Sequence, residues 1–344
     1  MKKDILSLTL EELKREEFFS SLPRFRAEQV YLWLHKQGVS SFEKMNNLPK
    51  TLITSLEETY EIRGVNLLER LVSSVDGTVK YLFSLCDGEL VETVLLRSDR
   101  GLSVCVSSEV GCKMGCVFCA SAKLGFKRKL SAGEMLSQVY YAAFDSGERI
   151  SSVMLMGIGE PLDNYENVMR FIDLLSDENG KNLSERHISL STCGIVPEIK
   201  RLAEEKRQLT LSISLHSPFE ETRSEMMPIN KKYNIKELKE ALDYYLLKTG
   251  RRISVEYAVI EGENDSDSAA KELKKLFGSG LYHINLIPLN EIKEKPYKTA
   301  APAVAHRFKE KLLKLGLNAT VRRRLGADIE AACGQLRREY NKEG

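Results

Sequence analysis

Hydrophobic and polar positions repeat with two different periods in the first hundred residues. Up to about residue 70, apolar residues recur every three or four positions, as in LTLEELKREEFFSSL and RAEQVYLWLHKQ, and this spacing predicts helices. Between residues 71 and 97 the period becomes two, and the pairs Asp76-Gly77 and Asp87-Gly88 separate the alternating runs, which predicts hairpins. We therefore expect a helical N-terminal domain at 1–70 and a small β-meander at 71–97.

Beyond residue 101, short apolar runs alternate with amphipathic helical stretches. Strands are predicted at 102–108, 152–157, 187–192, 210–216, 252–260 and 282–289, and a last helix, AVAHRFKEKLLKLG, precedes one more apolar run, NATVRR. Six βα units imply a parallel sheet with right-handed crossovers. They are too few for a closed eight-fold barrel, so we expect an α/β fold with a partial (βα)6 barrel at 98–330 and a C-terminal segment at 331–344. A flat doubly wound sheet is the alternative.

The composition is that of an ordinary globular protein, with 42% hydrophobic and 29% charged residues in a chain of 344. No apolar run approaches the roughly 18 residues that a membrane span requires. Acidic and basic residues are spread through the first 18 positions, where a signal peptide would have its apolar core. We therefore expect a cytoplasmic protein. The formal net charge of +2 argues against a histone-like binder, but a local basic surface for nucleic acid remains compatible with it.

Unusual polar residues and glycines follow the ends of the predicted strands. They are Cys112, Cys116 and Cys119 after the first, Gly157–Pro161 after the second, Ser191 and Thr192, then Ser214 and His216, and finally Asn290. The carboxyl ends of parallel strands meet at one edge of a sheet, where barrel and open-sheet enzymes keep their active sites. This shared placement predicts an enzyme.

Three of the seven cysteines form the pattern C-x3-C-x2-C in GCKMGCVFC, with Phe118 before the last one. Three thiolates can hold three irons of a [4Fe–4S] cube and leave the fourth iron open for a ligand. Structural zinc usually takes four ligands in two separated pairs, and the sequence has no second CxxC pair. Buried free thiols are the other alternative, but they would make the close spacing a coincidence. The pattern favours an iron–sulfur cluster.

This cysteine pattern after a first strand resembles the signature of radical S-adenosylmethionine (SAM) enzymes. Seven segments narrow the resemblance to the RlmN/Cfr family of radical SAM RNA adenine methyltransferases. In chain order they are CVSSEVGCKMGCVFCA, LMGIGEPLDN, LSTCG, SISLHSP, MMPINKKYNI, INLIPLN and DIEAACGQL, and VETV at 91–94 extends the match. The matching segments span about two-thirds of the chain, and their common order makes the resemblance specific.

The resemblance implies two cofactors and the residues that hold them. Cys112, Cys116 and Cys119 would bind one [4Fe–4S] cluster, whose open iron takes the amino and carboxylate groups of SAM. The positions that match the SAM contacts of the family are Gly159, Glu160, Ser191, Ser214, Leu215, His216 and Asn290. Considered alone, His216 would more often be a structural histidine.

The resemblance also implies catalytic roles for three residues. Cys333 would first be methylated by one SAM, and a second SAM would be cleaved reductively to a radical that activates this methyl group. Cys105 would resolve the RNA adduct by forming a disulfide with Cys333, and Glu92 would accept a proton. Without the motifs, the two cysteines would be read as buried small hydrophobes and Glu92 as a solvated carboxylate. Cys86 and Cys193 match no such role, and we interpret them as structural.

The partners implied by the resemblance are 23S rRNA, tRNA and a flavodoxin-type electron donor, with the enzyme itself a monomer. Three basic clusters could contact phosphates, namely KLGFKRK at 123–129, Lys231-Lys232 and Arg322–Arg324. Each could equally be a solvated surface. The N-terminal helical domain is a candidate second RNA-contact surface, since a target base must be unstacked to reach the site.

The family has two branches that share this chemistry. One methylates C2 of adenosine 2503 in 23S rRNA and of adenosine 37 in tRNAs, and the other methylates C8 of the same rRNA adenosine and confers antibiotic resistance. LMGIGEPLDN and PINKKYNI favour the C2 branch, whereas EIKEKPYKTAAP after IPLN departs from its usual pattern. A non-catalytic RNA-binding protein with a structural metal is the hypothesis from another class.

Overall fold

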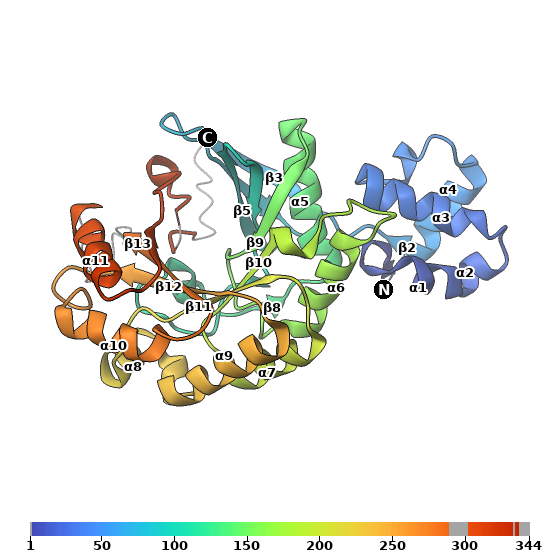
Figure 1. Ribbon diagram of the computed structural model, residues 1–344. Coiled ribbons are helices and arrows are strands. Elements are labelled where there is room, and N and C mark those ends of the chain that lie inside the picture. The colour runs from blue at the N-terminus through green and yellow to red at the C-terminus, as the bar shows by residue number, and fades with distance from the viewer. Residues whose placement is uncertain (1, 289–301, 333, 337–344) are drawn as a thin grey trace.

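The N-terminal region is a small helical domain beside the main body of the molecule (Figure 1). The computed structural model describes residues 2–288, 302–332 and 334–336. The helices are α1 (Leu10–Arg15), α2 (Glu17–Ser20), α3 (Phe25–Tyr31) and α4 (Lys50–Thr59), and short strands β1 (Lys3–Asp4) and β2 (Tyr60–Glu61) pair in parallel. Thr9 and Glu12 form a reciprocal capping box that begins α1. The expected helical character is thus confirmed up to Thr59.

The β-meander begins earlier than the sequence predicts. Its strands are β3 (Asn66–Val72), β4 (Val79–Ser84) and β5 (Leu90–Ser98). The expectation that helices reach residue 70 is wrong there, because nearly all of β3 is exposed and its sequence lacks the alternation that marks a half-buried strand. Both predicted Asp-Gly turns are confirmed, with positive φ at Gly77 (+71°) and Gly88 (+81°).

The meander continues directly into the main sheet, which runs in the order β14-β13-β12-β11-β10-β9-β6-β5-β4-β3. The remaining strands are β6 (Gly101–Cys105), β9 (Ile150–Leu155), β10 (Ile188–Thr192), β11 (Thr210–Ser214), β12 (Ile253–Val259), β13 (Tyr282–Pro288) and β14 (Ala319–Val321). Every neighbouring pair from β6 to β14 is parallel, and the order never reverses. A doubly wound sheet would reverse once, so the partial barrel is confirmed.

Helices cover the outer face of the curved sheet (Figure 1). They are α5 (Ala132–Ser146), α6 (Tyr165–Ser176), α7 (Val196–Glu205), α8 (Glu220–Met226), α9 (Ile235–Thr249), α10 (Asp267–Phe277) and α11 (Pro302–Lys314). A separate two-stranded pair, β7 (Glu109–Val110) and β8 (Arg128–Lys129), flanks the cysteine loop.

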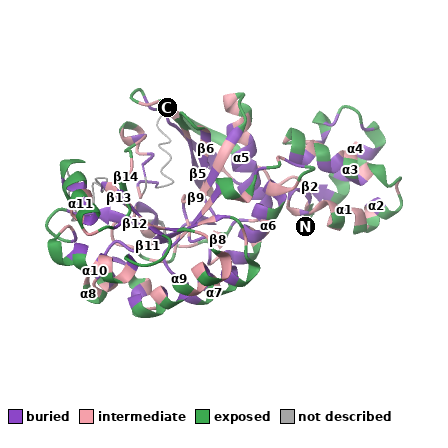
Figure 2. Cartoon of the chain, in the orientation of Figure 1, coloured by how far each residue is buried: buried purple, intermediate pink, exposed green. Residues whose placement is uncertain are grey.

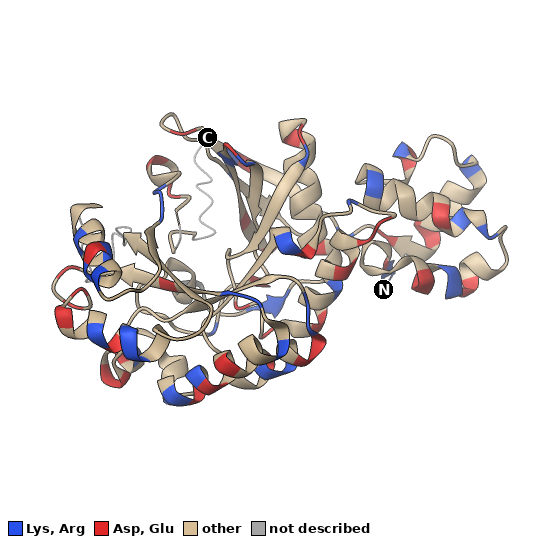
Figure 3. Ribbon diagram, viewed as in Figure 1, with Lys and Arg blue, Asp and Glu red and all other residues tan. Residues whose placement is uncertain are grey.

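One hydrophobic core runs from the N-terminal domain through the barrel. The barrel strands are largely buried, while the outer faces of the helices are exposed (Figure 2). Acidic and basic residues intermingle on those helices (Figure 3), which accounts for the small net charge. Among the described residues, no helix combines the length and the apolar character needed to cross a membrane.

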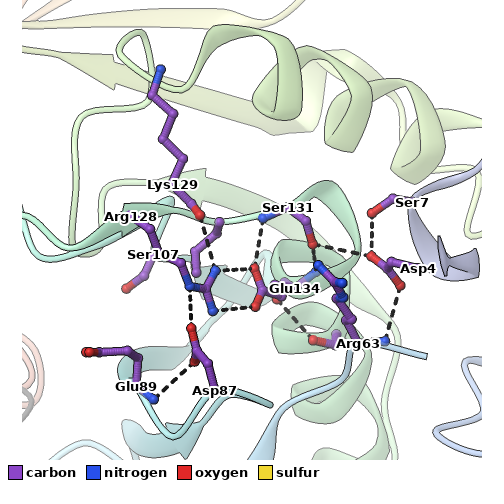
Figure 4. A network of polar contacts seen from close by, with 12 residues as sticks. Asp4, Ser7, Arg63, Asp87, Glu89, Ser107, Arg128, Lys129, Ser131 and Glu134 are labelled. Atoms are coloured by element: carbon purple, nitrogen blue, oxygen red, sulfur yellow. Dashed lines mark hydrogen bonds and ion pairs between the residues drawn. The ribbon is translucent and has the colours of Figure 1, made fainter. Parts of the chain in front are cut away.

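A polar network joins the N-terminal segment to the start of α5 (Figure 4). Ser7 donates to Asp4 (2.6 Å) and accepts from the backbone N–H of Gly133 (2.8 Å), while the N–H of Arg63 donates to the other Asp4 oxygen (3.1 Å). Ser131 donates to Asp4 as well (3.3 Å). Because α5 is part of the barrel, these bonds fix the N-terminal domain against it.

Arg128 extends the same network toward the meander (Figure 4). Its guanidinium forms a two-pronged ion pair with the buried Glu134 at 2.8 Å and a further pair with Asp87 at 2.6 Å. Glu134 also closes a capping box with Ser131 at the start of α5. Arg128 therefore stabilises the fold. The other basic residues of 123–129 remain the candidates for phosphate contact.

Candidate active site

The carboxyl ends of the barrel strands surround a cavity, whose empty space is about 980 Å³ when the part open to solvent is included. Its lining brings together almost the whole set of residues that the sequence singles out: Cys112, Cys116, Cys119, Gly159, Glu160, Ser191, Ser214 and His216. Leu215, in contrast, is fully buried behind the lining. Asn290 lies outside the described residues. The expectation that the strand ends converge on one site is therefore confirmed for the described positions.

The cysteine loop is held against the segment that follows β11. The N–H of Val117 donates to the carbonyl of Met226 (3.0 Å), and a Cβ on Gly115, whose φ is +71°, would touch Pro228. Burial raises the pKa of Cys112 to about 12 and raises the pKa of Cys116 further. Thiolates at these two positions therefore require a strongly cationic group to hold them in the charged form.

The donor set fits an iron–sulfur cluster. Within the described residues, no three His, Cys, Asp or Glu side chains converge closely enough to ligate a single metal ion. A tetrahedral zinc site needs such convergence, with ligands at about 2.0–2.3 Å. In a [4Fe–4S] cube the thiolates bind separate irons and stand further apart, as three cysteines distributed around one cavity can.

Two glycines bring the loop after β9 close to its neighbours. A Cβ on Gly159, where φ is +111°, would lie 2.7 Å from the Cβ of Glu109, and one on Gly157 would lie 2.7 Å from the backbone of Val106. Glu160 follows and is buried, which raises its pKa. Its carboxylate accepts the backbone N–H groups of Leu162 (3.1 Å) and Cys193 (2.8 Å). Close packing thus requires glycine at both positions and fixes Glu160 at the cavity wall.

His216 is a neutral hydrogen-bond donor in the cavity wall. Its Nδ1 accepts the backbone N–H of Ala258 (2.9 Å), so that the ring proton resides on Nε2. Burial lowers the pKa of His216 to about 3, which keeps the ring uncharged at neutral pH. The residue has a left-handed backbone (φ +59°), and Asn264 holds its carbonyl at 2.7 Å. A fixed neutral donor in a strained position is typical of a binding site.

Sequence reasoning missed a buried arginine that ties the strand ends together. Arg223 on α8 is about 1% exposed and donates to the carbonyls of Cys193 (2.8 Å) and Ser214 (3.2 Å) and to Asn230 (2.6 Å). It thereby connects the loops after β10 and β11. Its sequence context, an acidic helical turn, predicts a solvated side chain, and the motif MMPIN that supplies Asn230 was the one available signal.

Two buried carboxyl groups were also missed. Glu256 in β12 lines the cavity and accepts from Asn285 (2.7 Å) and Ser254 (2.8 Å). Glu109 accepts the N–H of Glu160 (2.9 Å), and burial raises its pKa. Glu256 interrupts the apolar run SVEYAVI, and a charge in such a run is the signal that could have revealed it.

A second cavity, with about 790 Å³ of empty space when the part open to solvent is included, adjoins the first. The two share Cys119, Met156, Gly157, Arg322 and Gly334 among their lining residues. Cys105, at the end of β6, lines the second cavity together with Ala331, Ala332 and Gly334, and it packs against Ala331 and Leu336. Cys333 itself lies outside the described residues. The residues on both sides of it nevertheless meet Cys105 in one cavity, far apart as they are in sequence.

Glu92 lies on β5 with its side chain on the same sheet face as Val94, which pairs with Cys105. It is about 3% exposed, and its carboxylate accepts from the ammonium of Lys80 at 3.3 Å. Its carbonyl accepts the hydroxyl of Ser107 (2.6 Å). Glu92 is therefore a buried, paired carboxylate, contrary to the solvated residue that periodicity alone predicts. Arg322–Arg324 line the second cavity, whereas Lys231 and Lys232 are exposed on the surface.

Two family models match the chain. The radical SAM superfamily matches residues 106–273, and the N-terminal domain of ribosomal RNA large subunit methyltransferases matches residues 3–62. Among solved structures, a radical SAM methyltransferase from Sphaerobacter thermophilus superposes with a TM-score of 0.94 at 41% identity, covering 98% of this chain and all of that one. The fold and the cysteine-lined cavity therefore define a radical SAM enzyme, with the [4Fe–4S] cluster and SAM that this class uses.

Full-length relatives identify the particular family. A protein from Clostridium novyi is 48% identical over 338 residues, and one from Lachnoclostridium phytofermentans is 50% identical over 339. The alignments cover 98% of this chain and 98% and 95% of those proteins, both of which are named probable dual-specificity RNA methyltransferase RlmN. The chain belongs to the RlmN family of radical SAM methyltransferases.

Proposed function

We propose that this enzyme methylates C2 of adenosine 2503 in 23S rRNA and of adenosine 37 in tRNAs, consuming two SAM per turnover. The observation that supports this best is the continuity of the two cavities. The first contains the cluster cysteines and the second contains Cys105 beside the neighbours of Cys333, with Cys119 and Gly334 common to both. A methyl group carried on Cys333 would then pass between SAM and an RNA base without leaving a protected space.

The first cavity is the proposed SAM site. When bound, the cluster and SAM supply the radical that removes a hydrogen atom from the methyl group. Cys112, Cys116 and Cys119 would ligate the cluster, while the neutral Nε2–H of His216 and the backbone around Glu160 would bind and orient SAM. The full set of proposed SAM contacts is Gly159, Glu160, Ser191, Ser214, Leu215, His216 and Asn290.

The second cavity is the proposed site of the adenine base. Adenine C2 is electrophilic, so that direct transfer of a methyl cation to it lacks a nucleophile, and a thiol-bound methyl group offers another route. Cys333 would accept the methyl group, Cys105 would resolve the adduct through a Cys105–Cys333 disulfide, and Glu92 would take up the proton. Arg322–Arg324 at the wall of this cavity would contact RNA phosphates.

The same proposal covers the partners. A flavodoxin-type donor would supply the electron for SAM cleavage, the enzyme would work as a cytoplasmic monomer, and the N-terminal domain would add a second RNA-contact surface. The domain division stays a prediction: an N-terminal domain at 1–70, a meander at 71–97, a barrel at 98–330 and a C-terminal segment at 331–344. Strand β3 begins at Asn66, inside the region expected to be helical.

The test is an anaerobic reaction of the cluster-loaded enzyme with unmodified 23S rRNA and tRNA, followed by mass spectrometry of the nucleosides. We expect 2-methyladenosine from both RNAs. The 8-methyl isomer would instead assign the enzyme to the C8 branch, and the absence of any methyladenosine would contradict both assignments.

Cysteine variants separate catalysis from folding. We expect Cys333→Ala to abolish methylation while the cluster absorbance and the melting temperature stay unchanged, and Cys116→Ala to lose both cluster and turnover. Cys86→Ala is the matched control, because Cys86 is exposed and lines neither cavity. Methylation by Cys116→Ala without a cluster would contradict the radical mechanism.

A further inference from the structure

The hairpin formed by β3 and β4 makes hydrogen bonds to residues 326–332. These residues, the anchor loop, immediately precede Cys333 in the chain. Asp76 accepts the backbone N–H of Gly326 (2.8 Å), and the backbone N–H of Ser74 donates to Asp328 (3.1 Å). Lys80 on β4 donates to the carbonyl of Glu330 (3.5 Å). Three separate contacts along five residues of the anchor loop therefore come from one hairpin, although about 250 residues of chain lie between them.

The anchor loop contains strained backbone conformations, which the contacts with the hairpin stabilise. Gly326 and Glu330 both adopt left-handed conformations, with φ of +63° and +50°. A Cβ on Gly326 would lie 2.8 Å from Thr78 of the hairpin and 2.8 Å from Ala331 of the loop itself. A left-handed Glu is costly and persists where its surroundings determine it. The hairpin supplies those surroundings, and the N–H of Ala331 closes the loop by donating to the carbonyl of Gly326 (2.8 Å).

The chain on the other side of residue 333 is held by the cluster loop. The N–H of Ala120 donates to the carbonyl of Gly334 (2.8 Å), and the hydroxyl of Ser121 donates to the carbonyl of Leu336 (3.1 Å). Ala120 and Ser121 directly follow Cys119. The described residues before position 333 are thus held by the hairpin, and those after it by the cysteine loop.

Lys80 connects the anchor loop to Glu92. Its ammonium is 3.3 Å from Glu92 Oε1 and 3.5 Å from the carbonyl of Glu330, and the Lys80 and Glu92 side chains are only 12% and 4% exposed. An ammonium has three donors, so that one lysine can serve both acceptors at once. The proposed proton acceptor and the loop before the proposed methyl acceptor therefore share one buried cation.

We propose that Lys80 and Asp76 are positioning residues. They fix the anchor loop beside Cys105, so that the chain would present Cys333 to that thiol, and Lys80 also holds Glu92. The inference rests on the proposed function of these three residues. It assigns the meander a role in the reaction, because the hairpin fixes the approach of the two thiols whose Cα atoms must come within about 7 Å for a disulfide to form.

The test measures the Cys105–Cys333 disulfide in the cluster-loaded enzyme, equilibrated anaerobically in glutathione redox buffers. Formation of the disulfide reduces one oxidised glutathione to two thiols, so the ratio of the peptides in mass spectrometry reports how readily the two cysteines meet. The variants are Lys80→Met, which keeps the length of the side chain but removes both contacts, Lys80→Arg, which keeps a cation, and Asp76→Ala. Asp87→Ala is the matched control, because Asp87 occupies the equivalent turn of the next hairpin.

We expect Lys80→Met and Asp76→Ala to lower the disulfide equilibrium constant by about tenfold or more, and Lys80→Arg to restore most of it. Asp87→Ala should leave the constant at the wild-type value even if it lowers the melting temperature. A wild-type constant in both Lys80→Met and Asp76→Ala, with only the melting temperature reduced, would overturn the positioning role alone. Wild-type enzyme that forms no such disulfide in any buffer would overturn the proposed roles of the cysteines, and the positioning role with them.

Discussion

The two hairpins of the meander carry the same turn sequence and hold different parts of the enzyme. In each, one carboxylate oxygen of the Asp accepts from its own turn: Asp76 from Thr78 (2.9 Å) and Asp87 from Glu89 (3.1 Å). The other oxygen reaches a distant segment. Asp76 holds the anchor loop through Gly326, whereas Asp87 holds Arg128.

The difference shows that a local turn signal does not determine what the turn is for. The turn of the β3–β4 hairpin contacts the loop that precedes Cys333. The turn of the β4–β5 hairpin contacts the network that joins α5 to the N-terminal domain (Figure 4). The Asp-Gly pair forms the turn in both cases, and the side-chain partner, supplied by a remote segment, gives each hairpin its role. One meander therefore holds the anchor loop with one hairpin and contributes to domain packing with the other.

The largest expected effect distinguishes the two faces of β5, the second strand of the β4–β5 hairpin. Glu92→Gln should reduce the methylation rate by about 10²–10⁴-fold, the usual contribution of a general base. It should also lower the free energy of unfolding, because the ammonium of Lys80 loses its carboxylate partner. The neighbouring Thr93 faces the other way and donates to the buried Gln138 (2.8 Å). Thr93→Val should lower the free energy of unfolding by about 1 kcal/mol and leave the rate per folded molecule unchanged.

These two variants are compared by single-turnover nucleoside analysis and by urea denaturation. Equal rates for Glu92→Gln and wild type would remove Glu92 from the mechanism and would leave the face next to Cys105 with a packing role only.

The second prediction concerns the β4–β5 side. Arg128→Met leaves the buried carboxylate of Glu134, whose side chain is 3% exposed, without its guanidinium. We expect the free energy of unfolding to fall by about 2 kcal/mol, because hydrogen bonds to charged groups are lost from a buried partner. The Cys105–Cys333 disulfide equilibrium should keep its wild-type value. A shifted equilibrium would show that the two hairpins act as one unit.

The smallest expected effect is the acid dependence of stability at both turns. Hydrogen bonding and the charge of Arg128 lower the pKa of Asp87; at Asp76 burial opposes ionisation, but hydrogen bonds from Thr78 and Gly326 outweigh it and lower the pKa. A carboxyl with a depressed folded-state pKa contributes stability that is present above its unfolded value and is lost as the pH falls through the folded value.

Asp76→Asn and Asp87→Asn should each flatten the fall in melting temperature between about pH 5 and pH 2, and both turns should show this to a similar degree. If only Asp87→Asn flattens the pH dependence, the hydrogen bond from Gly326 does not stabilise the ionised carboxylate of Asp76.

Much of the fold could be predicted from the sequence because its signals are local. Alternation and Asp-Gly pairs predict the meander turns, and apolar runs between amphipathic helices predict the barrel strands in their order along the sheet. The start of β3 was missed because an exposed edge strand buries too little to produce alternation. The capping boxes at Thr9 and Ser131 were visible as S/T-x-x-E and would have marked the helix starts.

The residues of the candidate site could be predicted where they belong to a sequence motif. They could not be predicted where only tertiary packing brings them to the site. The three cysteines of the C-x3-C-x2-C pattern, Glu160 and His216 lie at strand ends or in motifs, and all of them line the cavity. Arg223 and Glu256 lie in segments with no chemical motif of their own, and their burial depends on partners from other strands. The contact of Lys80 with Glu330 has no local signal, because the two residues are 250 apart in the chain.

The openness of the barrel has a consequence for the order in which the molecule assembles. The sheet ends at β3 on one side and β14 on the other, and the chain that leaves β14 crosses back to the β3–β4 hairpin. Closing so long a loop is entropically costly and is repaid only when both of its ends already have structure. The sheet, with its cysteine-lined cavity, can therefore form on nascent chain before the anchor loop arrives, so that the segment nearest to Cys333 is the last to take its place.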